Sequence, residues 1–148
     1  MSEDLDALYQ RVILDHSRRP RNYRAIERAR EAEGHNPLCG DRLTIYLRIE
    51  DDRIVDASFL GTGCAIAMAS ASMMTEVVRG KTVGEAEALL VRLRRLITSP
   101  PDTPVGDLGP IAALAGVRRF ALRQKCATLP WHALVAGASH SGRSVSTE

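Results

Sequence analysis

The residues of this chain best suited to chemistry are its three cysteines and one aspartate. Each lies at a glycine turn or at the start of an expected helix: Cys39, Asp41, Cys64 and Cys126. Thiolates bind zinc, iron and other thiophilic metals, and four ligands complete the tetrahedron that zinc prefers. The sequence therefore predicts one metal site made of three thiolates and a carboxylate.

The carboxylate would make such a site exchangeable. An oxygen ligand is harder than sulfur, so Asp41 should release a thiophilic metal more readily than a fourth thiolate would. The 148 residues, of which 45% are hydrophobic, suffice for one domain whose core needs no metal to hold it together. We therefore expect the metal to have a functional role.

Each of these residues, taken alone, has a plainer interpretation. Cys64 beside an apolar helix fits small core filling, Asp41 fits a residue that caps a turn, and the separations between the cysteines match no short zinc-finger spacing. The histidines are other possible ligands or bases: His16, His35, His132 and His140. We expect His16 instead to cap or pack the first helix. Three methionines at helical spacing are expected in the core: Met68, Met73 and Met74.

The loop that carries Cys39 and Asp41 is expected between a helix and a hairpin. Apolar residues at helical spacing predict an amphipathic helix over residues 4–16, which Pro20 ends, and the next residues, 17–38, are polar and irregular. Alternation of apolar and polar residues predicts strands over 43–49 and 54–60. The short polar connection between these strands predicts an antiparallel hairpin.

Cys64 and Cys126 are both expected near the start of a helix. Residues 65–79 are rich in Ala and Met, with Gly80 as a C-cap, and predict a buried helix whose N-terminus favours the thiolate of Cys64. Pro130 is best tolerated in the first turn of a helix, which would put Cys126 near the start of another one.

The chain between these two helices is expected to be helical at both ends and irregular in the middle. Thr82 and Glu85 have the spacing of a capping box for an amphipathic helix over residues 83–98. Residues 99–110 hold four of the seven prolines and predict a surface loop, which a short helical turn over 111–114 follows. Three arginines are expected on the solvent face of the first of these helices: Arg92, Arg94 and Arg95.

Composition argues against several classes of function. An odd cysteine count, no secretory pattern at the N-terminus and no run of ~20 apolar residues lead us to expect a cytoplasmic protein that does not contact a membrane. A net charge of +2 does not indicate nucleic-acid binding, and the chain has no GxGxxG motif or P-loop. A local basic run fits a solvated loop or a docking patch for an acidic protein surface: Arg18, Arg19, Arg21, Arg24, Arg28 and Arg30.

Motifs along nearly the whole chain resemble those of the IscU/NifU family of iron-sulfur scaffold proteins, and especially of its SufU branch. The matching blocks include Leu8-Tyr9, Val12-Ile13, Asp15-His16, Pro20-Arg21-Asn22, Asn36-Pro37, Cys39-Gly40-Asp41, Gly63-Cys64-Ala65-Ile66, Met68-Ala69-Ser70-Ala71-Ser72-Met73-Met74 and Lys125-Cys126-Ala127-Thr128-Leu129. Two features match the SufU branch. Lys125 stands where IscU-type scaffolds have a histidine, and residues 98–115 match a long insertion.

The resemblance implies an α+β fold of the SufE/NifU type. In this fold a small antiparallel three-stranded sheet is packed by helices on one side, and the metal site lies at the edge. We expect the domain to cover residues 1–136 and residues 137–148 to form a flexible tail.

The resemblance also implies roles for the candidate residues. Zinc, as in the SufU branch, would be bound by Cys39, Asp41, Cys64 and Cys126. Cys39 would accept sulfur from a cysteine desulfurase, and a guanidinium at Arg123 would steady thiolate or persulfide charge. Arg123 also fits an ordinary surface arginine of a helix, and Lys125 could play a similar electrostatic part.

Three functions fit this resemblance. The first is a zinc-dependent sulfurtransferase that relays persulfide sulfur from a SufS-type desulfurase into cluster assembly. The second is a non-enzymatic scaffold on which Cys39, Cys64 and Cys126 hold a [2Fe-2S] cluster for downstream assembly proteins or apoproteins. The third is a structural zinc domain for protein interaction. The absence of the IscU-type histidine favours the first.

Overall fold

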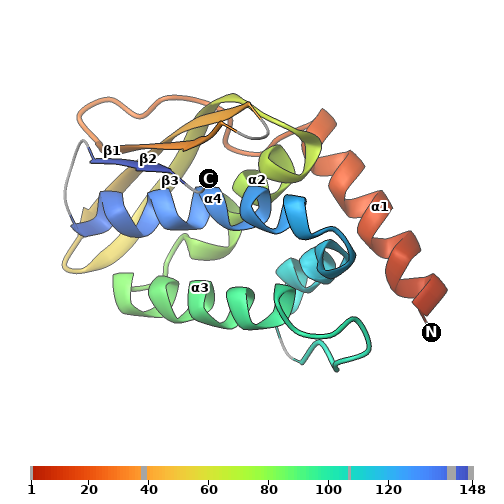
Figure 1. Cartoon of the computed structure of the whole chain (residues 1–148). Helices are drawn as coiled ribbons and strands as arrows, with labels where there is room; N and C mark the ends of the chain where they lie inside the picture. Colours follow the sequence, from red (N-terminus) through yellow and green to blue (C-terminus); the bar gives the residue numbers. More distant parts are fainter. Residues whose placement is uncertain (1, 38–39, 107, 140–142, 147–148) are drawn as a thin grey trace.

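The elements that carry the candidate ligands belong to a sheet and to the helices on one of its faces (Figure 1). This computed structural model describes residues 2–37, 40–106, 108–139 and 143–146. Within them the elements follow in the order α1 (Ser2–Arg18), β1 (Arg30–Asn36), β2 (Asp41–Glu50), β3 (Arg53–Thr62), α2 (Ala65–Val78), α3 (Val83–Ile97), the 3-10 helix η1 (Gly109–Arg119), α4 (Ala121–Ser139) and β4 (Arg143–Ser146). The strand order in the sheet is β3-β2-β1-β4.

The hairpin of β2 and β3 forms as its alternation predicts. The two strands are antiparallel, and their inward positions pair in register, as Ile45 and Phe59 do, both almost fully buried. The turn residues Asp51 and Asp52 have φ angles of 51° and 65°. Aspartate tolerates this left-handed region, and tight hairpin turns use it.

The sequence predicts irregular chain over residues 17–38, and this prediction is wrong for β1. This strand pairs antiparallel with β2, and its inward residues are Ala32, Gly34 and Asn36, none of them large and apolar. Helix α4 passes so close that a Cβ atom at Gly34 would lie 3.1 Å from the side chain of Leu129. The close approach of α4 therefore requires small inward residues in β1. Such residues do not form the alternation of large apolar and polar residues from which a strand is predicted.

The three antiparallel strands are confirmed, and a fourth strand adds to them. β4 pairs in parallel with β1, with Arg143 opposite Ala32. The chain beyond residue 136 thus has secondary structure where a flexible tail is expected, since α4 continues to Ser139 and β4 follows. Pairing of backbone with the open edge of β1 needs no apolar pattern, so the sequence does not reveal it. The domain limit of 1–136 stays a prediction.

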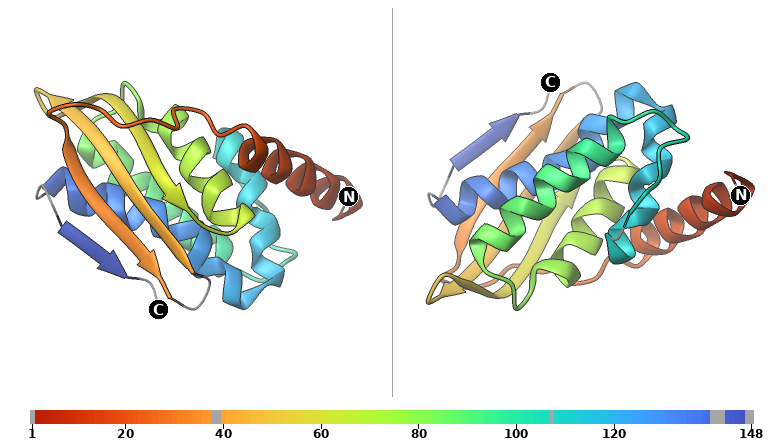
Figure 2. Two further views of the ribbon diagram at one scale, coloured as in Figure 1. Left: turned by 90° about the horizontal axis from the view of Figure 1, so that it is seen from above. Right: turned by 90° about the horizontal axis from the view of Figure 1, so that it is seen from below.

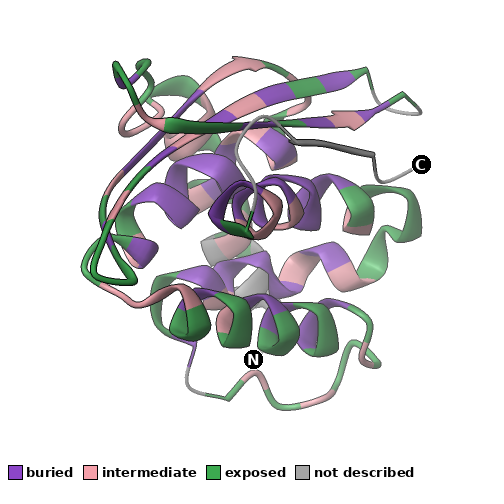
Figure 3. Ribbon diagram, turned by 90° about the vertical axis from the view of Figure 1, so that its left-hand side faces the viewer, coloured by how far each residue is buried: buried purple, intermediate pink, exposed green. Residues whose placement is uncertain are grey.

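Helices α2 and α4 pack on the sheet, and α3 and η1 lie beyond them (Figures 1 and 2). Helix α2 is built from small and sulfur-containing residues and is buried over most of its length (Figure 3). Met73 and Met74 are buried, and Met68 packs against the core, as predicted. None of the helices in the described ranges is long and apolar enough to cross a membrane.

Helix α4 begins earlier than the sequence predicts. It starts at Ala121, so Cys126 lies in its second turn and Pro130 lies in its interior, and the prediction of Pro130 in the first turn is wrong. An interior proline removes one helical hydrogen bond and costs about 3 kcal/mol or more. Ten residues of α4 are buried, Pro130 among them, and this burial outweighs the lost hydrogen bond.

Helix α3 and the segment after it follow the prediction with one extension. The capping box is present, because the Glu85 amide donates to Thr82 Oγ1 at 3.1 Å and the Thr82 amide donates to Glu85 Oε1 at 2.9 Å. The expected helical turn over residues 111–114 is part of a longer element, η1.

The motif Pro20-Arg21-Asn22 fixes α1 to α2 and to the edge of the sheet. Ser72 Oγ of α2 lies 2.7 Å from His16 Nδ1 and accepts from the Arg21 amide at 2.8 Å. Asn22, at a φ of 57°, donates through Nδ2 to Thr75 Oγ1 at 3.0 Å, and its carbonyl accepts from the backbone of β3. His16 therefore packs the first helix, as expected.

Part of the basic run is neutralised within the chain. Arg21 forms an ion pair with Asp15 at 2.7 Å, and Arg24 forms one with Asp56 at 2.9 Å. These arginines hold the segment before β1 in place, which favours the interpretation of an ordinary solvated loop.

The centre of the core holds a buried polar contact between α2 and α4. Trp131 is fully buried, and its Nε1 donates to Ser70 Oγ at 3.1 Å. Ser70 in turn donates to the Ala127 carbonyl at 2.5 Å. This contact joins the two helices that carry Cys64 and Cys126.

We expect Ser70→Ala to lower the free energy of unfolding by about 1–3 kcal/mol, because it leaves the buried Trp131 N–H without a partner. Chemical denaturation followed by tryptophan fluorescence measures this. The matched control is Ser17→Ala, whose hydroxyl donates to a local backbone carbonyl at the surface and whose loss should change stability by less than about 0.5 kcal/mol. Equal effects of the two substitutions would contradict the assignment.

Candidate metal centre

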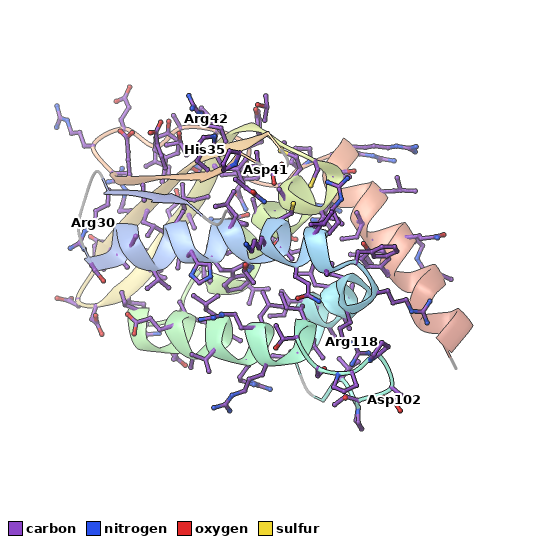
Figure 4. All side chains as sticks on the ribbon, viewed as in Figure 1. Arg30, His35, Asp41, Arg42, Asp102 and Arg118 are labelled. Atoms are coloured by element: carbon purple, nitrogen blue, oxygen red, sulfur yellow. The ribbon has the colours of Figure 1, made fainter. Side chains whose placement is uncertain are left out.

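Three of the four predicted ligands come together at one end of the sheet. The ligand atoms of Asp41, Cys64 and Cys126 all lie within 4.8 Å of one another. They come from the first residue of β2, the residue before α2 and the second turn of α4. Figure 4 labels Asp41, which lies where the sheet meets the helices. Cys39 lies outside the described residues, two positions before Asp41.

The two carboxylate oxygens of the buried Asp41 have different surroundings. Its Oδ1 accepts from the Cys64 amide at 2.7 Å, and its Oδ2 accepts no hydrogen bond from any residue that the structure describes. A buried carboxylate oxygen without a donor is unfavourable, and a bound cation would satisfy it. Two thiols and a carboxylate within 4.8 Å fit zinc by donor type. The residues present therefore fit the predicted metal.

Gly63 permits the close approach of Asp41 to the start of α2. A Cβ atom at residue 63 would lie 2.9 Å from Asp41 Oδ1 and 3.3 Å from the Cβ of Ala67. A side chain at this position would push the carboxylate away. The glycine before Cys64 is thus a requirement of the site.

Cys64 is the N-cap residue of α2 and is poised as a thiolate. Its Sγ accepts from the Ala67 amide at 3.4 Å. A hydrogen bond from the Cys126 thiol is the largest cause that lowers the pKa of Cys64 to about 6, and the helix amides act in the same direction against burial and the charge of Asp41. The expectation that the helix start favours the Cys64 thiolate is thereby supported.

Cys126 is fully buried and is held from the sheet side. The Nδ2 of Asn36, the last residue of β1, lies 3.6 Å from Cys126 Sγ and donates to it. Asn36 is itself fully buried. The sequence pattern does not predict β1, and for that reason it does not predict this contact either.

Tyr23 is a residue near the site that the sequence does not reveal. Its hydroxyl donates to the Gly61 carbonyl at 2.7 Å and accepts from the Gly61 amide at 3.3 Å, while its ring meets Phe59 edge-on at 5.1 Å. Gly61 has a φ of 135°, and a Cβ atom there would collide with the Arg42 carbonyl oxygen. Tyr23 thus fixes the end of β3, which leads to Cys64.

Arg123 is an exposed residue in the first turn of α4, close in sequence to Cys126. It is three residues before Cys126, which places the two on neighbouring positions of the helix surface. Burial raises the pKa of the Tyr9 phenol, the charge of Cys64 raises it further, and the charge of Arg123 lowers it. Both Cys64 and Arg123 are therefore near Tyr9. Lys125 is exposed on the same helix.

The histidines do not join the group of ligands in the described part of the chain. Among those residues the group contains Asp41 and two cysteines only. His132 is half-buried on α4, where burial and then the charge of Arg94 lower its pKa. His140 lies outside the described residues.

Comparisons with known proteins connect this geometry to a family. Residues 8–127 match the NifU-like N terminal domain, a range that includes all four predicted ligands. The chain belongs to this family. The family predicted from the motifs is thereby confirmed.

Several relatives match over most of the chain, and two of them illustrate the range of functions. The zinc-dependent sulfurtransferase SufU of Bacillus subtilis is 41% identical over 134 residues, which make up 90% of this chain and 91% of the relative. The iron-sulfur cluster assembly scaffold protein IscU of Streptococcus pyogenes is 38% identical over 130 residues, or 88% of this chain and 82% of the relative. Similar relatives thus carry names of both functional types.

Solved structures confirm the fold. An iron-sulfur cluster assembly scaffold protein of the SUF system from Fervidobacterium islandicum matches with a TM-score of 0.81 and 34% identity, over 89% of this chain and 97% of that one. The N-terminal part of a NifU-like protein from Brucella abortus matches in fold with a TM-score of 0.80, at 24% identity, over 94% and 96%.

The pKa of Cys64 predicts the pH dependence of its alkylation. In metal-free protein, the rate of iodoacetamide labelling at Cys64, followed by peptide mass spectrometry, should rise through about pH 6, because the thiolate is the nucleophile. Cys126→Ala removes the hydrogen bond that lowers this pKa and should move the midpoint upward. A midpoint near the value of an ordinary thiol in both proteins would contradict the geometry.

Tyr23→Phe tests the contact that fixes the end of β3 before Cys64. Loss of one hydroxyl that bonds both polar groups of Gly61 should weaken zinc affinity about fivefold, by loosening the position of Cys64. Competition with a chromophoric chelator measures the affinity. The control is Tyr46→Phe on the outer face of the sheet, which should leave the affinity unchanged, and an unchanged affinity for Tyr23→Phe as well would refute the role.

Proposed function

We propose that this chain is a SufU-type sulfurtransferase of iron-sulfur cluster assembly, which works in the cytoplasm. The observation that carries the proposal is the preassembled trio of Asp41, Cys64 and Cys126, with a buried Asp41 oxygen that accepts no hydrogen bond from the described residues. The SufU name of the Bacillus subtilis relative supports zinc as the metal. In this proposal Cys39 is the fourth ligand.

The reaction we propose is a transfer of sulfane sulfur to Cys39. The Cys39 thiolate attacks the outer sulfur of a persulfide on a cysteine desulfurase of SufS type. A sulfur–sulfur bond forms on Cys39, the sulfur–sulfur bond of the donor breaks, and the donor cysteine leaves as a thiolate. No external oxidant or reductant is needed, and Cys39 persulfide is the product.

Zinc, when bound, would favour the deprotonated thiols and hold the ligand loop. Residues of the chain itself would position the thiols and offset their negative charge. Asp41 and Cys64 are tied to each other through the Cys64 amide, and Asn36 orients the Cys126 thiol. Arg123 in the first turn of α4, near Tyr9, would offset the negative charge of a thiolate or persulfide. Carbon–sulfur cleavage stays with the partner.

A scaffold function is the second candidate, and the IscU name of the Streptococcus pyogenes relative favours it. In that case Cys39, Cys64 and Cys126 would hold a [2Fe-2S] cluster, which is passed to downstream assembly proteins or apoproteins. Lys125, in place of the histidine of IscU-type scaffolds, argues against it. A structural zinc domain is the third candidate.

Metal content and desulfurase stimulation, measured together, test the proposal. Protein purified without chelator should hold about one zinc per chain. It should increase alanine production by a SufS-type desulfurase, and Cys39→Ala should abolish the increase, because the acceptor sulfur is gone. Iron with labile sulfide and no stimulation would instead establish the scaffold, and stimulation that survives Cys39→Ala would favour the structural domain.

Asp41→Ala separates the two main candidates. For a sulfurtransferase, the loss of the carboxylate should remove zinc and transfer together, because Asp41 is both a ligand and the partner of the Cys64 amide. For a scaffold, the loss of a labile oxygen ligand should give a longer-lived cluster. Visible absorption after anaerobic reconstitution and zinc analysis distinguish these results.

A further inference from the structure

Helix α3 concentrates positive charge on its outer face, in the layer farthest from the sheet (Figure 1). We call Arg92, Arg94 and Arg95 the arginine face; all three are exposed. The residues three and four positions away from each of them on the helix are uncharged or are themselves arginine. No aspartate or glutamate therefore stands three or four positions from these arginines along α3, the spacing at which helix side chains pair.

Two hollows flank Arg95 on this face. The first has a volume of about 290 Å³ and is lined by Arg92, Arg95, Leu96, Ser99, Thr103, Pro104, Val105 and Leu108. The second has a volume of about 260 Å³ and is lined by Val91, Arg94, Arg95 and Thr98. Among the residues that the structure describes, the lining includes three cations and several apolar side chains, but no acidic residue and no aromatic one. The exposed Val91 adds apolar surface.

Arg118 holds the far wall of the first hollow in place. Its Nη1 donates to the Thr103 carbonyl at 2.7 Å and to the Pro100 carbonyl at 3.3 Å, and its Nε donates to the Ala115 carbonyl at 3.1 Å. Figure 4 labels Arg118 beside the loop that carries Asp102. These bonds fix the loop after α3 against η1, so the hollow is formed before anything binds.

We propose that the arginine face and its two hollows bind an acidic segment of a partner protein that also carries an apolar side chain. The carboxylates pair with the arginines, and the apolar side chain enters the first hollow over Leu96 and Leu108. Arginine suits carboxylates because its planar group can bond both oxygens. Single-stranded nucleic acid fits less well, because bases stack on aromatic side chains and the described lining of the two hollows contains none.

This surface is separate from the proposed sulfur chemistry. None of its lining residues is one of the four predicted metal ligands. Arg94 and Arg95 also interact favourably with the C-terminal end of the helix dipole, but that role explains neither Arg92 nor the apolar lining of the hollows. The partner can therefore remain bound while the metal centre works.

Fluorescence anisotropy with a short labelled peptide, rich in glutamate and with one central leucine, tests the proposal on the full chain. The double variant Arg92→Glu/Arg95→Glu should weaken binding at least about tenfold, because like charges across an interface repel. The same double variant should bind a lysine-rich peptide of the same design better than the wild type does. Replacement of the peptide leucine by alanine should weaken binding to the wild type about fivefold.

The matched control is Arg11→Glu/Arg18→Glu, which makes the same charge change on the exposed surface of α1. It should bind the acidic peptide nearly as well as the wild type. Circular dichroism and zinc content check that both variants fold, and Arg95→Gln replaces the double variant if that one does not.

Three results would overturn the proposal. One is unchanged peptide binding in Arg92→Glu/Arg95→Glu, or in Arg95→Gln if that variant is used. Another is equal weakening by the α1 control, which would show a general effect of net charge. The third is binding of polyphosphate or single-stranded DNA through the same arginines as tightly as the peptide, which would make this a surface for any polyanion. The proposed function assigns desulfurase stimulation to Cys39 and not to these arginines, so stimulation measured on the same variants tests that function separately.

Discussion

The hydrogen bond from the Cys64 amide to Asp41 Oδ1, 2.7 Å long, is the contact on which the metal centre depends. It joins the first residue of β2 to the residue before α2. Two ligands that are 23 positions apart in the sequence are thereby held in a fixed relative position. The second Asp41 oxygen is buried and accepts no hydrogen bond from the part of the chain that the structure describes. Gly63 makes the contact possible, because any side chain there would meet the carboxylate.

The rest of the fold holds this contact from several sides. On one side, Pro20-Arg21-Asn22 binds α2 through Ser72 and Thr75 and lies along the edge of β3, where Tyr23 fixes Gly61. On the other side, β1 brings Asn36 to the Cys126 thiol. The buried Trp131–Ser70 contact keeps α2 and α4 together. Motifs far apart in the sequence thus position the same small group of ligands.

The sequence predicts well whatever depends on periodic patterns or on residue chemistry. The β2–β3 hairpin and the capped α3 helix follow from alternation and capping residues, and the trio of ligands follows from thiophilic donors placed in motifs that resemble the family. Prediction from the sequence fails where contacts between distant segments determine the secondary structure. β1 is hidden because α4 demands small residues such as Gly34, and Pro130 sits inside α4 because burial outweighs a lost hydrogen bond. Tyr23 could not be found because its partner is backbone.

The most direct test of this account is X-ray absorption at the zinc edge of the purified, zinc-loaded chain. The account predicts three sulfur neighbours at about 2.3 Å and one oxygen at about 2.0–2.2 Å, since Cys39, Cys64 and Cys126 supply the sulfurs and Asp41 the oxygen. In Asp41→Asn the short oxygen distance should weaken or vanish. A shell with fewer than three sulfurs in the wild type, or one that Asp41→Asn leaves unchanged, would contradict it.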